Sequence, residues 1–71
     1  MSKRRLIQLL REVRREAKLT QRDLAARIGE TQSYVSKYES GEQRLDLLEI
    51  EAICKVVGLP LRDFIDRYVE N

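Results

Sequence analysis

Histidine and tryptophan are absent from this chain of 71 residues, which has one cysteine, one proline and three glycines. A Ser-His-Asp or Cys-His catalytic arrangement is therefore impossible within the chain, and we find no glycine-rich loop of the kind that cradles phosphates. With one thiol and no imidazole, a transition-metal site is not expected either. The residues predict neither an enzyme nor a bound metal or cofactor.

The one cysteine, Cys54, has no partner for an internal disulfide. It lies between Ile53 and Val57 on a predicted apolar stripe, so we expect a buried structural thiol rather than a nucleophile or a redox sensor. No hydrophobic run approaches the length of a membrane span, and the chain does not begin with a signal-peptide pattern. These absences predict a soluble, cytoplasmic protein without a membrane partner.

The composition that remains is that of a small helical domain. Hydrophobic residues make up 42% of the chain and charged residues 37%, so we expect one ordered, all-α domain over residues 1–71. A chain of this length is near the size at which a single core is only marginally sufficient. We therefore expect no large pocket for a small molecule.

Charge is distributed unevenly along the chain. The net charge is +2, but residues 1–22 carry eight Lys or Arg against two Glu, a balance of +6, and the remainder sums to −4. Such asymmetry predicts a polyanion that meets one side of the fold. A basic helix face that is only solvated is the alternative interpretation.

The stretch from Thr20 to Gly41 reads TQRDLAARIGETQSYVSKYESG and predicts two short helices joined by a tight turn. Thr20 can cap the first of these helices, and Asp23 can return a hydrogen bond in a capping-box arrangement. Gly29 can end that helix in the left-handed conformation, and Thr31 can cap the next one. The pattern is typical of a helix-turn-helix.

The outward face of the second of these helices, predicted over residues 32–40, is polar and has no acidic residue. It consists of Gln32, Ser33, Ser36, Lys37 and Ser40. A DNA-binding helix-turn-helix presents its second helix to the major groove, where Gln, Ser and Lys can bond base edges and phosphates. A polar face that is merely solvated has the same periodicity, so spacing alone leaves both interpretations open.

The other helices follow from apolar spacing and end signals. A first helix is predicted over residues 4–17, with a strongly basic polar side. After a loop at 42–45, Asp46 and Glu49 predict the cap of a fourth helix, which a Gly-Leu-Pro step at 58–60 ends. Its predicted apolar face is Leu47, Ile50, Ile53, Cys54 and Val57. A last helix is predicted over roughly residues 60–69.

Residues 10–59, LREVRREAKLTQRDLAARIGETQSYVSKYESGEQRLDLLEIEAICKVVGL, resemble the phage-repressor and Cro type of helix-turn-helix, the XRE family. The resemblance rests on an LTQ-x-x-LA opening, a glycine in the turn, a V-S-x-x-E-x-G ending and a following helix closed by a Gly-Leu step. It implies a compact five-helix, lambda-repressor-like bundle in which helices two and three form the helix-turn-helix. It also implies a homodimer on a near-palindromic operator in double-stranded DNA.

Four residues of the third helix match base-reading positions of the family: Gln32, Ser33, Ser36 and Lys37. The amide of Gln32 suits adenine N6 and N7, and Lys37 can donate to guanine O6 and N7. Ser33 and Ser36 are shorter than the side chains that relatives often have there. They can bond through water, bond a phosphate or read nothing, so the specificity could be modest.

Phosphate contacts are expected from the helix N-termini and from five side chains: Gln21, Arg22, Tyr34, Ser40 and Arg44. Gln21 also matches a family residue that braces the first base-reading side chain. Tyr34 can equally pack in the core, and Arg22 can instead pair with a neighbouring carboxylate. By the same resemblance, Arg14 and Glu39 match a structural ion pair that joins helix one to helix three.

The resemblance implies a sequence-specific transcriptional regulator, most often a repressor in this family. A single small module gives limited affinity, so we expect a dimer. The last helix is the expected dimer surface, through Leu61, Phe64, Ile65 and Tyr68. The alternative for these residues is that they close the core.

A different class of function stays open beside this one. The chain could be a protein-interaction module: an antitoxin that covers a toxin, or a helix-turn-helix domain that docks an effector domain. The acidic C-terminal part of the chain is compatible with such a partner, and antitoxins of the family often bind DNA as well.

Overall fold

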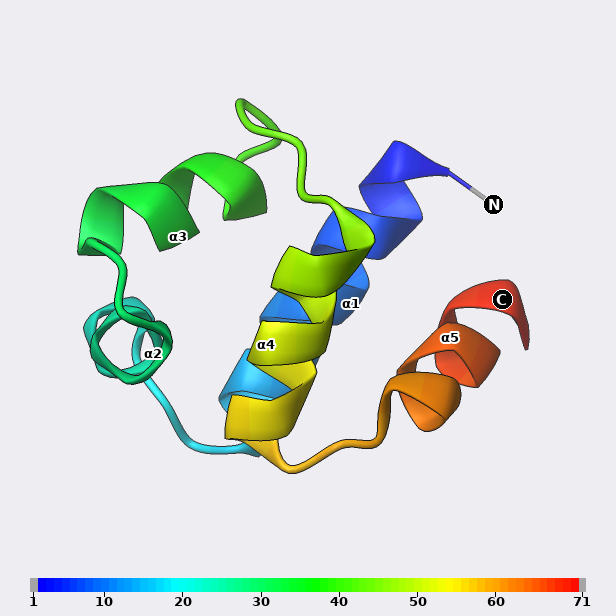
Figure 1. Ribbon diagram of the computed structural model, residues 1–71. Helices are drawn as coiled ribbons and strands as arrows, with labels where there is room; N and C mark the ends of the chain where they lie inside the picture. The colour runs from blue at the N-terminus through cyan, green and yellow to red at the C-terminus, as the bar shows by residue number, and fades with distance from the viewer. Residues whose placement is uncertain (1, 71) are drawn as a thin grey trace.

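The computed structural model describes residues 2–70, which fold into five helices (Figure 1). They are α1 (Lys3–Glu16), α2 (Gln21–Ile28), α3 (Gln32–Glu39), α4 (Leu47–Val57) and α5 (Leu61–Glu70). The all-α class and the helix order agree with the prediction, and where a range was predicted the observed ends differ by at most one residue. No helix within residues 2–70 has the length and apolar character needed to cross a membrane.

Capping residues set the start of α2 and the turn from α2 to α3. The hydroxyl of Thr20 accepts a hydrogen bond from the amide of Asp23, and the Asp23 carboxylate accepts one from the Thr20 amide, each at 3.0 Å. Gly29 ends α2 at φ +73°, a left-handed conformation that glycine adopts without strain. Thr31 then caps α3 by accepting from the amide of Tyr34 at 3.2 Å. These contacts define where α2 begins and where the chain turns from α2 into α3.

One hydrophobic core joins all five helices. Its most deeply buried apolar side chains are Leu9 and Leu10 of α1, Leu24 of α2, Val35 and Tyr38 of α3, Ile53 and Cys54 of α4, and Phe64 of α5. The expected burial of Cys54 is confirmed, and desolvation raises the pKa of its thiol. Because the core takes one side of α3, the opposite side of that helix is left to solvent.

The buried apolar face of α4 begins one turn later than predicted. Ile50 and Ile53 are buried, but Leu47 is 60% exposed, and its neighbour Leu48 is 75% exposed. Leu47 shares the stripe by spacing, yet it is the first residue of α4, immediately after the α3–α4 loop (Figure 1). The described part of the chain does not cover this end of the helix, so the prediction that Leu47 faces the core is wrong.

The last helix, α5, packs against α1 and α4. Phe64 is its one buried residue among those described, at 1% exposure. Two hydrogen bonds of 2.9 and 2.8 Å join the guanidinium of Arg67 to the carboxylate of Glu16 in α1. The hydroxyl of Tyr68 donates to the carbonyl oxygen of Ser2 at 3.1 Å. The buried Phe64, the half-buried Leu61 and Tyr68, and a set of polar contacts therefore hold α5 in place.

Candidate nucleic-acid interface

The exposed face of α3 carries the four predicted base-reading residues. Gln32, Ser33, Ser36 and Lys37 are all exposed, and their spacing places them on one side of the helix. Val35 and Tyr38 are buried on the opposite side, and Glu39 is buried at the C-terminal end of the helix against Arg14 of α1. The helix therefore presents a surface of amide, hydroxyl and ammonium groups without a carboxylate.

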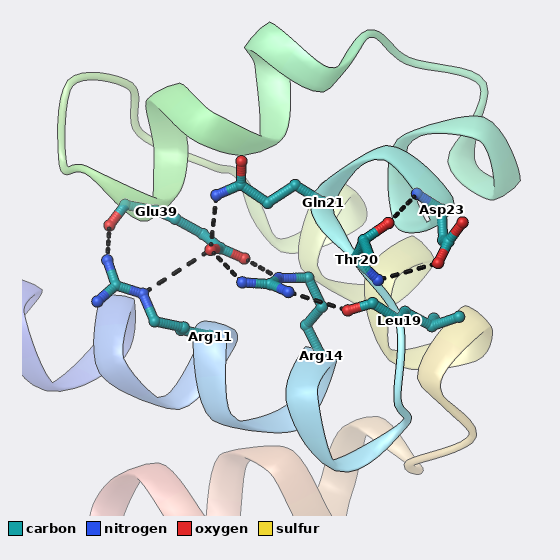
Figure 2. A network of polar contacts seen from close by, with 7 residues as sticks. All are labelled: Arg11, Arg14, Leu19, Thr20, Gln21, Asp23 and Glu39. Carbon is teal, nitrogen blue, oxygen red and sulfur yellow. Dashed lines mark hydrogen bonds and ion pairs between the residues drawn. The ribbon is translucent and has the colours of Figure 1, made fainter.

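The position of α3 depends on a buried carboxylate at its C-terminal end. Glu39 is 2% exposed, and its two oxygens accept hydrogen bonds from Arg14 in α1, at 2.7 Å from Nε and 3.0 Å from Nη2 (Figure 2). The ion pair expected between these two residues is thus present, in the two-pronged geometry that favours arginine over lysine. This hydrogen bond raises the pKa of the Arg14 guanidinium, which therefore stays charged.

Arg14 also ties the start of the helix-turn-helix to α1. Its Nη1 donates to the carbonyl oxygen of Leu19 at 2.9 Å, in the residue that precedes the Thr20 cap (Figure 2). One guanidinium thus contacts both the segment that leads into α2 and the end of α3. Because a buried charge is stable only when it is paired and hydrogen-bonded, these contacts restrict how α3 can sit.

Arg11 is a second cation beside the Glu39 carboxylate, and it was not predicted from the sequence. Its Nη2 donates to the backbone carbonyl of Glu39 at 2.9 Å, and its Nε lies 3.8 Å from Glu39 Oε1 (Figure 2). Arg11 stands three residues before Arg14 and so shares its helix face, which is the signal that could have indicated it. It satisfies a carbonyl at the C-terminal end of α3 that helix geometry leaves without an intrahelical partner.

The side chain of Gln21 turns toward Glu39. Its Nε2 donates to Glu39 Oε1 at 3.1 Å, and Figure 2 shows its carbonyl oxygen directed away from that carboxylate. The amide therefore links α2 to α3 directly. Its expected bond to a phosphate and its bracing of Gln32 remain predictions, although both residues line the same shallow depression beside Arg22.

Among the other expected phosphate contacts, Arg22 and Arg44 are the best placed. Both are exposed, and within residues 2–70 neither makes an ion pair. The pairing of Arg22 with a neighbouring carboxylate is therefore not seen. Ser40 is exposed too, but its Oγ lies 3.0 Å from the carbonyl oxygen of Lys37 and 3.3 Å from Glu42 Oε2. Its hydroxyl proton is already directed to protein acceptors.

Tyr34 takes the packing role rather than the phosphate role. Its ring meets that of Tyr38 edge to face, with centroids 5.7 Å apart, and its hydroxyl donates to Glu49 Oε2 at 2.7 Å. Burial and this hydrogen bond raise the pKa of the phenol. A carboxylate at this distance repels a phosphate, so the structure favours the core alternative for Tyr34.

The expected dimer surface on α5 is only partly exposed. Phe64 is buried in the core, so its assignment to the dimer surface is wrong and the alternative of core closure holds for it. Leu61 and Tyr68 are half-buried and pack against the core. Ile65 is 39% exposed, and Val69, which was not among the predicted residues, is 52% exposed.

Comparison with known proteins adds a family and a fold. The sequence model of a family described as helix-turn-helix matches residues 10–64. No protein of curated function matches the sequence. Among solved structures, the chain is similar to the crystal structure of the clp gene regulator ClgR from Corynebacterium glutamicum, with a TM-score of 0.84 and 22% identity over 96% of this chain and 72% of that chain. At that identity the likeness shows a shared fold.

Proposed function

This chain belongs to the XRE family of helix-turn-helix, DNA-binding transcriptional regulators, and on that premise we propose that it binds a specific sequence of double-stranded DNA with α3 in the major groove. Family membership indicates a regulatory protein rather than an enzyme. The observation that carries the proposal is the exposed polar face of α3 on a helix anchored by the buried Glu39. We also propose that the protein is cytoplasmic.

Base readout is assigned to the α3 face. Gln32 is at the first residue of α3, where its amide can offer a donor and an acceptor to adenine. Lys37 stands five residues further along the same face and can donate to guanine. Each such pairing contributes on the order of 1–3 kcal/mol of discrimination between bases. Ser33 and Ser36 have a shorter reach and are expected to contribute less.

Phosphate binding is assigned to Arg22, which precedes α3 in the chain, and to Arg44, which follows it. The free backbone amides at the N-termini of α2 and α3 supply further donors, since a helix N-terminus attracts an anion. Ser40 must exchange a protein acceptor for the phosphate, because its one hydroxyl proton already donates within the fold, whereas the Gln21 amide has a second N–H beside the one bonded to Glu39. We expect their contribution to be smaller than that of the two arginines.

We also infer a homodimer that acts as a repressor on a near-palindromic operator. What supports it is an exposed apolar pair on α5, Ile65 and Val69, which are one helical turn apart. Two copies would bring two α3 helices to half-sites about one helical turn of DNA apart. Occupancy of such an operator blocks transcription without any further activity.

A second function, docking of a protein partner such as a toxin or an effector domain, is favoured by one observation. Leu47 and Leu48 expose 60% and 75% of their surface at the start of α4. Adjacent exposed leucines are typical of an interaction surface, although two residues make only a small one. Isolation of a stable complex with a second small protein from the native host would favour this function.

The test is selection of bound duplexes from a random-sequence DNA pool, followed by measurement of affinity for the winner against salt concentration. The proposal predicts one two-fold symmetric sequence with half-site centres about one helical turn apart. Weak, salt-sensitive binding with no preferred sequence would contradict base reading by α3.

A further inference from the structure

A small cavity of about 240 Å³ lies between the first half of α1, the end of α3 and the α3–α4 loop. Figure 1 shows that loop passing beside the first turns of α1. Leu6, Ile7 and Leu10 supply its apolar wall, and Lys3 and Arg44 are its two cations. None of its lining residues is acidic. The cavity is thus apolar on one side and positively charged on another.

Tyr38 also lines this cavity, and its hydroxyl lacks a partner. The residue is 1% exposed, yet its hydroxyl makes no hydrogen bond within residues 2–70. Burial raises the pKa of this phenol, so at neutral pH it is a proton donor. Its oxygen has almost no accessible surface, so a ligand in the cavity contacts other atoms of Tyr38 and not its hydroxyl.

From these features we propose that the cavity binds a small monocarboxylate with a short aliphatic body. The carboxylate pairs with the cations Lys3 and Arg44, and the aliphatic body packs on Leu6 and Ile7. A water molecule occupies about 30 Å³ in the liquid, so the cavity accommodates roughly eight non-hydrogen atoms. Hexanoate has this size. Inorganic anions lack the apolar part, and longer lipids exceed the volume.

Binding here has a consequence for DNA that rests on the proposed function. Arg44 lines the cavity and is also one of the two arginines assigned to phosphate. One guanidinium cannot fully pair with the ligand carboxylate and with a DNA phosphate at once. Hexanoate is therefore expected to weaken DNA binding, as an effector that releases the operator.

The test is a titration of the isotope-labelled protein, without DNA, by hexanoate and by the neutral 1-hexanol, followed by NMR chemical shifts. The proposal predicts saturable shifts at residues 6–10 and 41–45 with hexanoate, and binding of 1-hexanol at least about tenfold weaker, as expected when a hydrogen-bonded charge is lost. No saturation with hexanoate, or equal binding of the two compounds, would overturn it.

Two variants locate the ligand. Tyr38→Phe is the control: it removes a buried, unpaired hydroxyl that the ligand does not reach, so it should fold at least as well as the parent and leave hexanoate affinity unchanged. Lys3→Gln, at the exposed start of α1, should weaken hexanoate but leave 1-hexanol unchanged. If Lys3→Gln does not alter hexanoate affinity, the ligand lies elsewhere and the assignment fails.

A second arm measures DNA affinity with and without saturating hexanoate. An unchanged affinity would overturn the competition for Arg44. If no specific DNA binding exists in the first place, the proposed function fails, and the titration without DNA still decides whether the cavity binds a carboxylate.

Discussion

The guanidinium of Arg14 in α1 and the carboxylate of Glu39 in α3 meet in two hydrogen bonds, of 2.7 and 3.0 Å, with both side chains buried. The pair joins the first helix to the helix that we assign to DNA. Gln21 contributes a third hydrogen bond to the same carboxylate from α2. Side chains from α1 and α2 therefore both bind the one buried carboxylate of α3.

Removal of one partner should be strongly destabilising. Arg14→Gln leaves Glu39 buried without its main cation, and we expect a loss of about 3 kcal/mol in the free energy of unfolding. That is a large part of the roughly 4–10 kcal/mol expected for a chain of this size. The matched control is Arg15→Gln at the exposed neighbouring position, with an expected change within about 0.5 kcal/mol. Urea unfolding of both variants measures the difference, and equal losses would show that the pair has no special role.

Base readout and phosphate binding can be separated by two substitutions. Lys37→Ala should relax base preference at one position in each half-site, because it removes a base-edge donor. Arg44→Ala should weaken binding to all sequences alike and reduce the slope of log affinity against log salt by about 0.9. Affinities for a set of single-base operator variants at several salt concentrations test both statements. Uniform loss of affinity in both variants would refute the division of roles.

The exposed part of α5 gives a prediction about assembly. Ile65→Lys places a charge on the proposed dimer surface, so sedimentation should show a shift from dimer to monomer. Asp66→Lys introduces the same charge at the next, exposed position and should leave the dimer intact. Phe64→Ala removes the core anchor of α5 and should instead lower the free energy of unfolding by about 3–5 kcal/mol. A dimer that survives Ile65→Lys must use another surface.

Acid should weaken the start of α4. The amide of Asp46 and the hydroxyl of Tyr34 hydrogen-bond the Glu49 carboxylate and hold its pKa below the ordinary value of 4.5. The resulting stabilisation is present above that value and is lost as pH falls through the lowered pKa. Glu49→Gln keeps an oxygen acceptor but loses its charge, so it should be less stable than the parent at pH 7 by about 1 kcal/mol, and the gap should narrow toward pH 3.

The control for this pH dependence is Glu51→Gln, two residues further along α4. Within residues 2–70 the side chain of Glu51 forms no hydrogen bond or ion pair, so Glu51→Gln should differ from the parent in free energy of unfolding by the same small amount at every pH. A stability gap for Glu49→Gln that stays constant from pH 7 to pH 3 would show that this carboxylate is not a source of acid sensitivity.

Local signals in the sequence were enough to predict the helices. Thr20, Gly29 and Asp46 act through backbone amides and backbone conformation within a few residues, so their effects can be read from neighbouring positions. The exposure of Gln32 and Lys37 followed from helical spacing for the same reason. The pairing of Arg14 with Glu39 spans 25 positions, and it was expected only because the family resemblance supplied it.

What the sequence could not supply was the extent of the core around each helix. Leu47 has the spacing of a core residue, but the core does not extend to it. No local sequence pattern shows how far the neighbouring helices reach. Phe64 was assigned to the surface because an apolar stripe does not say which of its members reaches the core. The hydrogen bond of Tyr34 to Glu49 joins side chains 15 positions apart and likewise depends on tertiary geometry.

The most direct test of the central claim is the ratio of affinities for the selected duplex and for a scrambled duplex of the same composition. It should be measured for the parent and for a variant in which Gln32, Ser33, Ser36 and Lys37 are all alanine. We predict a ratio of about 10³ or more for the parent and a ratio near 1 for the variant, with salt-sensitive binding to both duplexes retained. A variant that keeps the parental ratio would contradict base reading by α3.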